Sequence, residues 1–277
     1  MRRFIAGDTV DEAIQVAEEL VAKGLLVTMD LLGESVADEA EAIRAKAAFK
    51  SMLEKIAASP CAASTNISIK LTQCGLDQSD TFAESNLREV LTKASEFNNF
   101  VRVDMEASDY TERTIRMLER VWADFKNTGT VLQSYLLRTP EDVNLMVRLR
   151  MRTRLVKGAY LEPPSVAIQD KAEVDAAYIA QAKTLLESGF YPAIATHDEA
   201  IIKTLKEYVA EKGIGKDKFE WQMLFGIRRD LQDSLRAEGF NVRVYVPFGE
   251  SWYPYFSRRL AERPANLFFM LKSLFKG

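Results

Sequence analysis

Three charged residues near the C-terminus, Arg258, Arg259 and Glu262, have the types and the spacing of a carboxylate-binding site. They lie in the segment 245–267, YVPFGESWYPYFSRRLAERPANL, where a Pro/Gly/Ser turn separates a short β run from a helical stretch. Two adjacent guanidinium groups at such a place can hold a small carboxylate through bidentate hydrogen bonds. The chain carries the Arg-Arg dipeptide three times, so the position after the last strand, and not the dipeptide itself, supports this interpretation.

Polar side chains also stand at the ends of most short apolar runs in the chain. Together with the apolar Leu224, these strand-end residues are Lys70, Asp104, Gln133, Arg154, Lys157, Thr196, His197 and Tyr245. Burying polar groups is costly unless they are paired or face a ligand. Lys70 and Asp104 alone could form a structural ion pair, but the whole set favours a binding site.

The apolar runs have the length and the Val/Ile/Leu content of buried strands. The eight predicted strands are Leu25–Leu31, Asn66–Leu71, Phe100–Met105, Thr130–Ser134, Thr153–Lys157, Pro192–Thr196, Phe219–Leu224 and Asn241–Val246. Longer segments with helical spacing lie between them, for example Asp38–Ala58 and Lys171–Ser188. Strands that alternate with helices predict βαβ units and a parallel sheet.

Helix starts support the same alternation. Thr9–Glu12 and Thr81–Glu84 have the pattern of capping boxes, and Thr139 is expected to cap a helix with a proline and two acids in its first turn. A single-domain (β/α)₈ barrel needs about 250 residues, and this chain has 277. An open doubly wound sheet is the alternative, but Gly213-Ile-Gly215 lacks the third glycine of a dinucleotide fingerprint. We therefore expect one barrel over 1–277, with an N-terminal helix within 1–24 and a C-terminal helix within 252–277 that carries the arginine pair.

Composition excludes several other classes of protein. The formal net charge of -3, without a basic face or tail, argues against nucleic-acid binding. One histidine and two cysteines cannot build a common zinc site, and the cysteines form no disulfide framework. No segment has the length of a signal peptide core or a transmembrane helix. These features predict a soluble, cytoplasmic protein, and no metal site is expected, although carboxylate sites for harder metals stay open.

Several stretches together resemble the proline dehydrogenases of the monofunctional bacterial type. The matching stretches are ISIKLTQCG, VRVDMEAS, LQSYL, RLVKGAY, FEWQMLFG, VRVYVPFG and YFSRRLAERPAN. They occur in the family's order over nearly the whole chain, and RLVKGAY and YFSRRLAERPAN are the most specific. The resemblance extends to the proline dehydrogenase domain of bifunctional proline utilisation proteins.

The resemblance implies roles for the residues on the substrate side. Lys70, Arg258 and Arg259 would hold the proline carboxylate, and Glu262 would pair with the arginines. Leu224, Tyr245 and Tyr255 would shape the apolar pocket around the ring. Asp104 would act in catalysis by orienting Lys70. Proline is a small zwitterion, so cations for its carboxylate and an apolar wall for its methylenes suit it.

The resemblance also implies an FAD cofactor. Arg154 would lie near the reactive N5 atom of the flavin and serve catalysis as well as binding. The other implied FAD-binding residues are Met105, Gln133, Lys157, Gly158, Ala159, Thr196 and His197. The two small residues after Lys157 are typical of close backbone approach to a bulky ligand.

The implied reaction is FAD-dependent oxidation of L-proline to Δ1-pyrroline-5-carboxylate, the first step of proline catabolism to glutamate. Electrons would pass to a quinone-type acceptor. The chain has no room for a fused aldehyde dehydrogenase domain, so the product would go to a separate pyrroline-5-carboxylate dehydrogenase. Because quinones reside in membranes, peripheral contact of the apolar tail 266–277 with the inner face of the membrane is a hypothesis, although its packing on the barrel is favoured.

Two other functions stay open at this point. A barrel lyase could use Lys70 or Lys157 as a Schiff-base nucleophile. A barrel that binds an amino acid without a cofactor is disfavoured, because the flavin-side residues accompany the substrate-side ones. His197 as a general base and Cys61 or Cys74 as reactive thiols have little support, since His197 begins a helix-start sequence.

Overall fold

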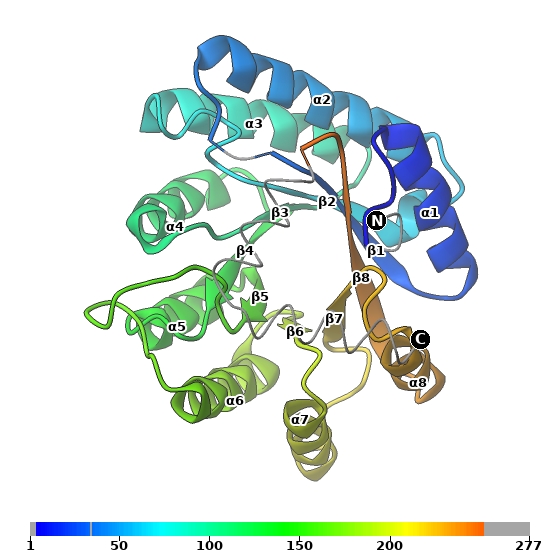
Figure 1. Ribbon diagram of the computed structural model, residues 1–277, viewed down its shortest axis with the longest axis vertical. Coiled ribbons are helices and arrows are strands. Elements are labelled where there is room, and N and C mark those ends of the chain that lie inside the picture. Colours follow the sequence, from blue (N-terminus) through cyan, green and yellow to red (C-terminus); the bar gives the residue numbers. More distant parts are fainter. Residues whose placement is uncertain (1–3, 34, 252–277) are drawn as a thin grey trace. The chain divides into compact units, whose positions relative to one another are not determined.

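The computed structural model describes residues 4–33 and 35–251, in which eight β-strands pair in chain order to close a barrel (Figure 1). One helix precedes the first strand, and one follows each strand from the first to the seventh. The order of helices and strands along the chain therefore gives seven βα units before the last strand. The predicted (β/α)₈ class is confirmed. None of the helices in the described ranges is both long and apolar enough to span a bilayer.

Each predicted apolar run overlaps a strand. The strands are β1 (Leu26–Leu31), β2 (Thr65–Ile69), β3 (Val101–Val103), β4 (Thr128–Gln133), β5 (Arg152–Val156), β6 (Ala193–Ala195), β7 (Glu220–Leu224) and β8 (Asn241–Phe248). The helices are α1 (Val10–Ala22), α2 (Glu39–Ala57), α3 (Asp80–Glu96), α4 (Ser108–Trp122), α5 (Thr139–Leu149), α6 (Lys171–Ser188), α7 (Glu199–Glu211) and α8 (Arg229–Ala237), with a short 3₁₀ turn at Ala62–Ser64. Pairing is parallel between β1 and β2, β2 and β3, β5 and β6, and β6 and β7.

The described chain falls into two units. The first contains residues up to Gly129, Leu224–Gly226 and the part of β8 from Val244 onward. The second contains Thr130–Met223 and Ile227–Arg243. Each unit has its own core and its own set of polar side chains, and each is described by itself.

In the first unit, helices α2 and α3 lie side by side along the strands (Figure 1). The sequence of α2 is rich in Ala, Glu and Lys, which are strong helix formers, and the Asp38 side chain caps its start by accepting from Glu41 N at 2.8 Å. One face of α2 is fully buried at Phe49, Met52 and Ile56. The other face is charged, and Lys46 pairs there with Glu89 of α3 at 2.6 Å. This amphipathic pattern fixes α2 against the strands that carry the substrate-side residues.

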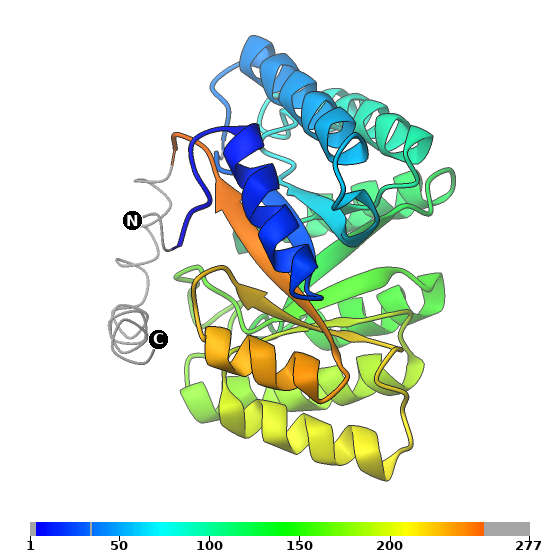
Figure 2. The ribbon, with the colours of Figure 1, turned by 90° about the vertical axis from the view of Figure 1, so that its right-hand side faces the viewer.

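In the second unit, helices α7 and α8 lie next to each other on the outside of the strands (Figure 2). Three aromatic rings pack beside them: Phe219, Trp221 and Phe240 have centroid separations between 5.6 and 6.1 Å. Edge-on and tilted rings at such distances stabilise a core beyond the area that they bury. This cluster anchors β7 and the segment that leads into β8.

Two of the three predicted capping residues are wrong. The Thr9–Glu12 capping box is present as predicted. Ser79, and not Thr81, caps α3, because Ser79 lies two residues earlier in extended backbone and accepts from Phe82 N. The carboxylate of Glu84 pairs instead with Arg88 and Arg120.

Helix α5 begins at the predicted Thr139, but this residue is not its cap. Its hydroxyl donates to the carbonyl oxygen of Gln133 at 2.6 Å, so Thr139 ties the helix to the end of β4. The N-cap position falls to Arg138, whose side chain makes no capping hydrogen bond. The predicted proline and acids do lie in the first turn.

Candidate active site

A buried ion pair joins Lys70, directly after β2, to Asp30 in β1. The Lys70 Nζ atom lies 3.2 Å from Asp30 Oδ1 and 3.5 Å from Oδ2. The strand register places Asp30 opposite Ser68, two residues before Lys70 on the same side of the strand. The side chains are 8% and 0% exposed, so both charges are out of water. Sequence reasoning missed Asp30, although an acid within the apolar run LLVTMDL was a visible signal.

Asp104, directly after β3, accepts hydrogen bonds from two neighbours in the same unit. Ser68 Oγ donates to Oδ1 at 3.0 Å, and Tyr245 Oη donates to Oδ2 at 2.8 Å. The structure therefore brings the predicted Asp104 and Tyr245 into contact. The orientation of Lys70 by Asp104 stays a prediction, because the carboxylate recorded on the Lys70 ammonium is that of Asp30.

Two further predicted residues of the first unit, Met105 and Leu224, are linked to that cluster, one by sequence and one through a backbone hydrogen bond. Met105 is buried beside Asp104, and Leu224 is half-buried at the end of β7. Phe225 N donates to the carbonyl oxygen of Tyr245 at 2.9 Å, which holds the residue after Leu224 against β8. Tyr245 lies within β8 and not at its end.

The second unit contains a buried polar chain that reaches Arg154 in β5. Arg154 Nε donates to Gln222 Oε1, and Gln222 Nε2 donates to Glu220 Oε1 at 2.5 Å. Arg243 Nε donates to both oxygens of Glu220 at 2.9 and 3.0 Å. Arg154 is 5% exposed, so its guanidinium is oriented by protein groups and not by water. Glu220 and Gln222 were not among the predicted site residues.

Lys157, directly after β5, is held between two carboxylates. Its Nζ atom lies 2.5 Å from Asp175 Oδ1 on α6 and 3.0 Å from Asp198 Oδ2 before α7. Asp198 also caps α7 and accepts a hydrogen bond from Ala200 N. Partial burial disfavours the ionised form of Asp198, but the hydrogen bonds from Lys157 and the helix outweigh it and lower its pKa. The ammonium of Lys157 thus has a fixed place at this strand end.

Thr196 and His197 lie in the turn between β6 and α7. The Thr196 hydroxyl accepts from Asp198 N at 3.1 Å, which links it to the residue that holds Lys157. Thr196 is buried and His197 is half-buried. Gln133, at the end of β4, is buried, and its carbonyl oxygen accepts from Thr139.

Position 158 requires glycine because of its backbone conformation and a close aromatic ring, which the sequence did not reveal. Its φ of 115° is in the region that favours glycine, and an added Cβ would lie 2.2 Å from the ring of Tyr135. The Tyr135 hydroxyl donates to the carbonyl oxygen of Tyr160 at 3.3 Å, so the ring lies under the loop after β5. Close approach at Gly158 is made by Tyr135, and its contact with FAD stays a prediction, as does that of Ala159.

Replacing Gly158 with alanine is expected to lower the free energy of unfolding by about 2–3 kcal/mol, because strain adds to a clash with the ring. Gly213→Ala is the matched control: its φ is also positive at 64°, but an added Cβ would meet no atom within 4 Å. That control should lose only about 1 kcal/mol. Urea denaturation of both variants measures the difference, and equal losses would show that Tyr135 is not the cause.

Four predicted site residues, Tyr255, Arg258, Arg259 and Glu262, lie outside the described residues. Both cysteines are buried thiols. Burial, with the nearby carboxylate of Glu106, raises the pKa of Cys74 to about 12. The Cys74 thiol is therefore protonated at neutral pH and unsuited to nucleophilic chemistry.

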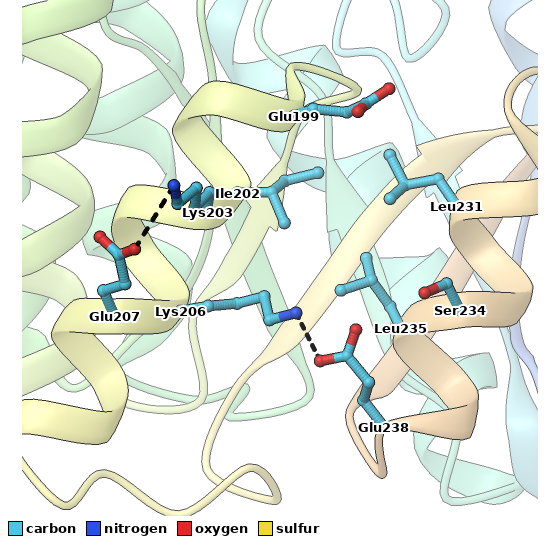
Figure 3. A pocket seen from close by; sticks show the side chains of 9 residues that line it. All are labelled: Glu199, Ile202, Lys203, Lys206, Glu207, Leu231, Ser234, Leu235 and Glu238. Atoms are coloured by element: carbon cyan, nitrogen blue, oxygen red, sulfur yellow. Dashed lines mark ion pairs between the residues drawn. The ribbon is translucent and has the colours of Figure 1, made fainter.

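A groove of about 380 Å³ lies between α7 and α8 (Figure 3). Its walls are Ile202, Leu231 and Leu235, and ion pairs of Lys203 with Glu207 and Lys206 with Glu238 line it. These residues belong to the facing sides of two packed helices and include no strand-end residue. The groove therefore belongs to the helix packing and not to the candidate active site.

A sequence profile described as Proline dehydrogenase matches residues 13–272 of the chain. The chain belongs to the proline dehydrogenase family. Membership in this family makes it an oxidoreductase that acts on proline.

The chain is similar to proline dehydrogenases of comparable length. Proline dehydrogenase 1 of Bacillus subtilis subsp. natto is 43% identical over 275 residues, which are 99% of this chain and 90% of that protein. The proline dehydrogenase of Deinococcus radiodurans is 41% identical over 280 residues, again 99% of this chain and 90% of that protein.

Longer relatives share the proline dehydrogenase fold. The crystal structure of proline utilization A from Bdellovibrio bacteriovorus, inactivated by N-propargylglycine, matches with a TM-score of 0.87 and 28% identity. The match covers 94% of this chain and 32% of that one, so the chain spans about a third of the longer protein.

Proposed function

We propose that this proline dehydrogenase oxidises L-proline to Δ1-pyrroline-5-carboxylate with FAD and passes the electrons to a quinone-type acceptor. The observation that carries the proposal is the buried ammonium of Lys70 directly after β2 in a chain of this family. A cation at the carboxyl end of a barrel strand is placed where such barrels bind their substrates.

Substrate recognition is assigned to the group in the first unit. Lys70 binds the carboxylate of proline, and Leu224 with Tyr245 contributes the apolar wall for the ring. Tyr255, Arg258, Arg259 and Glu262 keep their proposed roles as a further wall and a second carboxylate clamp. The contact of Tyr245 with Asp104 supports its place, because it fixes the direction of the phenol ring.

The donor groups of the second unit fit the chemistry of FAD. Arg154 and Lys157 supply cations for an anionic cofactor, and Gln133 supplies an amide that can donate and accept. When bound, FAD supplies the acceptor for the hydride that leaves the carbon next to the proline nitrogen. A buried guanidinium such as that of Arg154 stabilises negative charge near it. Met105, Gly158, Ala159, Thr196 and His197 complete the proposed FAD-binding set.

A Schiff-base lyase has less support than it had from the sequence alone. A nucleophilic lysine must present a neutral amine. Lys70 is paired with Asp30, and Lys157 with two carboxylates, so both side chains already have partners of opposite charge. Borohydride trapping with a carbonyl substrate distinguishes the two functions, since covalent labelling of either lysine would favour the lyase.

The visible spectrum of the purified protein tests the proposed function directly. Flavin absorbance that bleaches when L-proline is added without oxygen is the expected result, and D-proline at the same concentration serves as the control. A colourless protein that cannot be reconstituted with FAD would refute the proposal. Transfer to a soluble quinone analogue then tests the acceptor, and a pyrroline-5-carboxylate dehydrogenase added to the assay tests the product.

A further inference from the structure

Asp30 is the most deeply enclosed carboxylate of the substrate-side group, with no exposed surface. The charged or titratable side chains that face it are Lys70, Asp104 and Tyr245. Burial raises the pKa of Asp30, and the ammonium of Lys70 opposes this rise. The ammonium of Lys70 and a hydrogen bond from Tyr245 both favour the charged form of Asp30, and Lys70 Nζ lies 3.2 Å from its Oδ1 atom.

Stability is a weak explanation for such a pair. Removing two charges from water costs several kcal/mol per ion, and well-packed apolar residues of similar volume are often as stable. A role in orientation explains it better, because a lysine side chain has four rotatable bonds and an ammonium without fixed geometry.

A second residue fixes the backbone on which this pair stands. Gln73, 4% exposed, donates from Nε2 to the carbonyl oxygen of Leu31 at 2.9 Å and accepts from Lys70 N at 3.1 Å. One amide thus joins the residue after Asp30 to Lys70 itself. The main chains of β1 and of the loop after β2 are held together at the level of the ion pair.

We propose that Asp30 is a positioning residue for proline binding, which acts by fixing the Lys70 ammonium toward the substrate carboxylate. Gln73 supports this geometry, because its amide hydrogen-bonds the backbone of both Leu31 and Lys70. The inference rests on the proposed function and deepens it. Asp30 does not contact the substrate in this proposal. Its effect is confined to ligands that carry a carboxylate, because only those use Lys70.

A double-mutant cycle on the FAD-loaded protein tests the proposal. The variants are Asp30→Asn, Lys70→Met and the combination, and Asp11→Asn is the matched control, since Asp11 also pairs with a lysine but is exposed. Measured are flavin content, kcat and KM for L-proline, and inhibition constants of cyclopentanecarboxylate and cyclopentylmethanol. Asp30→Asn should raise KM and the inhibition constant of the carboxylate about 10- to 100-fold, the range for losing a charged hydrogen bond.

Three further results are expected. Inhibition by the alcohol and the flavin content should stay within about twofold of wild type, a change too small for a lost hydrogen bond. In the Lys70→Met background, Asp30→Asn should add nothing, because its only route to the substrate is gone. Gln73→Met should raise KM less than Asp30→Asn does. This variant tests the proposal in place of Asp30→Asn if Asp30→Asn does not fold.

Several results would overturn the inference. The first is an unchanged KM in Asp30→Asn or, where that variant does not fold, in Gln73→Met. The second is equal weakening of both inhibitors by Asp30→Asn. The third is an undiminished effect of Asp30→Asn in the Lys70→Met background. A wild-type holoprotein that does not oxidise L-proline overturns the proposed function, and the inference with it. A wild type that does so, with Asp30→Asn unchanged, overturns the inference alone.

Discussion

Lys70→Met protein is expected to oxidise L-proline with kcat/KM lowered about 30-fold or more, because truncating one partner of a buried, hydrogen-bonded charge pair costs about 2–5 kcal/mol. Methionine keeps the length of the side chain and removes the charge. The loss should appear mainly in KM, since the carboxylate lies away from the carbon that is oxidised. Flavin content should be unchanged, because the proposed FAD-binding residues are elsewhere in the sequence.

Steady-state kinetics with an artificial electron acceptor measure this effect. Lys55→Met is the matched control: Lys55 also pairs with an aspartate, at 2.6 Å, but its side chain is 43% exposed. That variant should keep wild-type kinetics. A Lys70→Met protein with the KM of wild type would remove Lys70 from the substrate site.

The fold was predictable because its signal is local. Each apolar run overlaps a strand, since parallel strands buried on both faces are continuous in apolar residues. Helix starts were less predictable. Serine and threonine both favour the N-cap position, and the sequence does not show whether Ser79 or Thr81 adopts the extended backbone of a cap. The carboxylate that would complete the Thr81 box, Glu84, is recruited by Arg120 from another helix.

The candidate site was predictable in its members and less so in its contacts. Active-site residues of such barrels lie at the carboxyl ends of strands, and this rule predicted Lys70, Asp104 and Arg154 individually. Their partners depend on strand register and on residues inside strands, where an acid such as Asp30 had been read only as part of an apolar run. Gly158 shows the same limit, because the ring that requires it belongs to Tyr135, 23 positions earlier.

A second large effect is expected at Glu220, whose side chain has no exposed surface. Replacement by glutamine should lower the free energy of unfolding by about 3–5 kcal/mol, the usual cost of leaving a buried charge uncompensated. Arg243 donates to both oxygens of this carboxylate. Burial lowers the pKa of Arg152, and the charge of Glu220 opposes that change. Glutamine fills the same space but supplies no negative charge to either guanidinium.

Urea denaturation of Glu220→Gln measures the loss, and Glu207→Gln is its control. Glu207 pairs with Lys203 at 3.9 Å on the surface of α7, where its side chain is 68% exposed. Because exposed pairs contribute at most about 1 kcal/mol, the control should remain close to wild type. The double variant Glu220→Met/Arg243→Met should recover part of the loss, since an apolar pair of similar volume needs no counter-charge. Equal stability of Glu220→Gln and Glu207→Gln would mean that water or other groups already balance the two arginines.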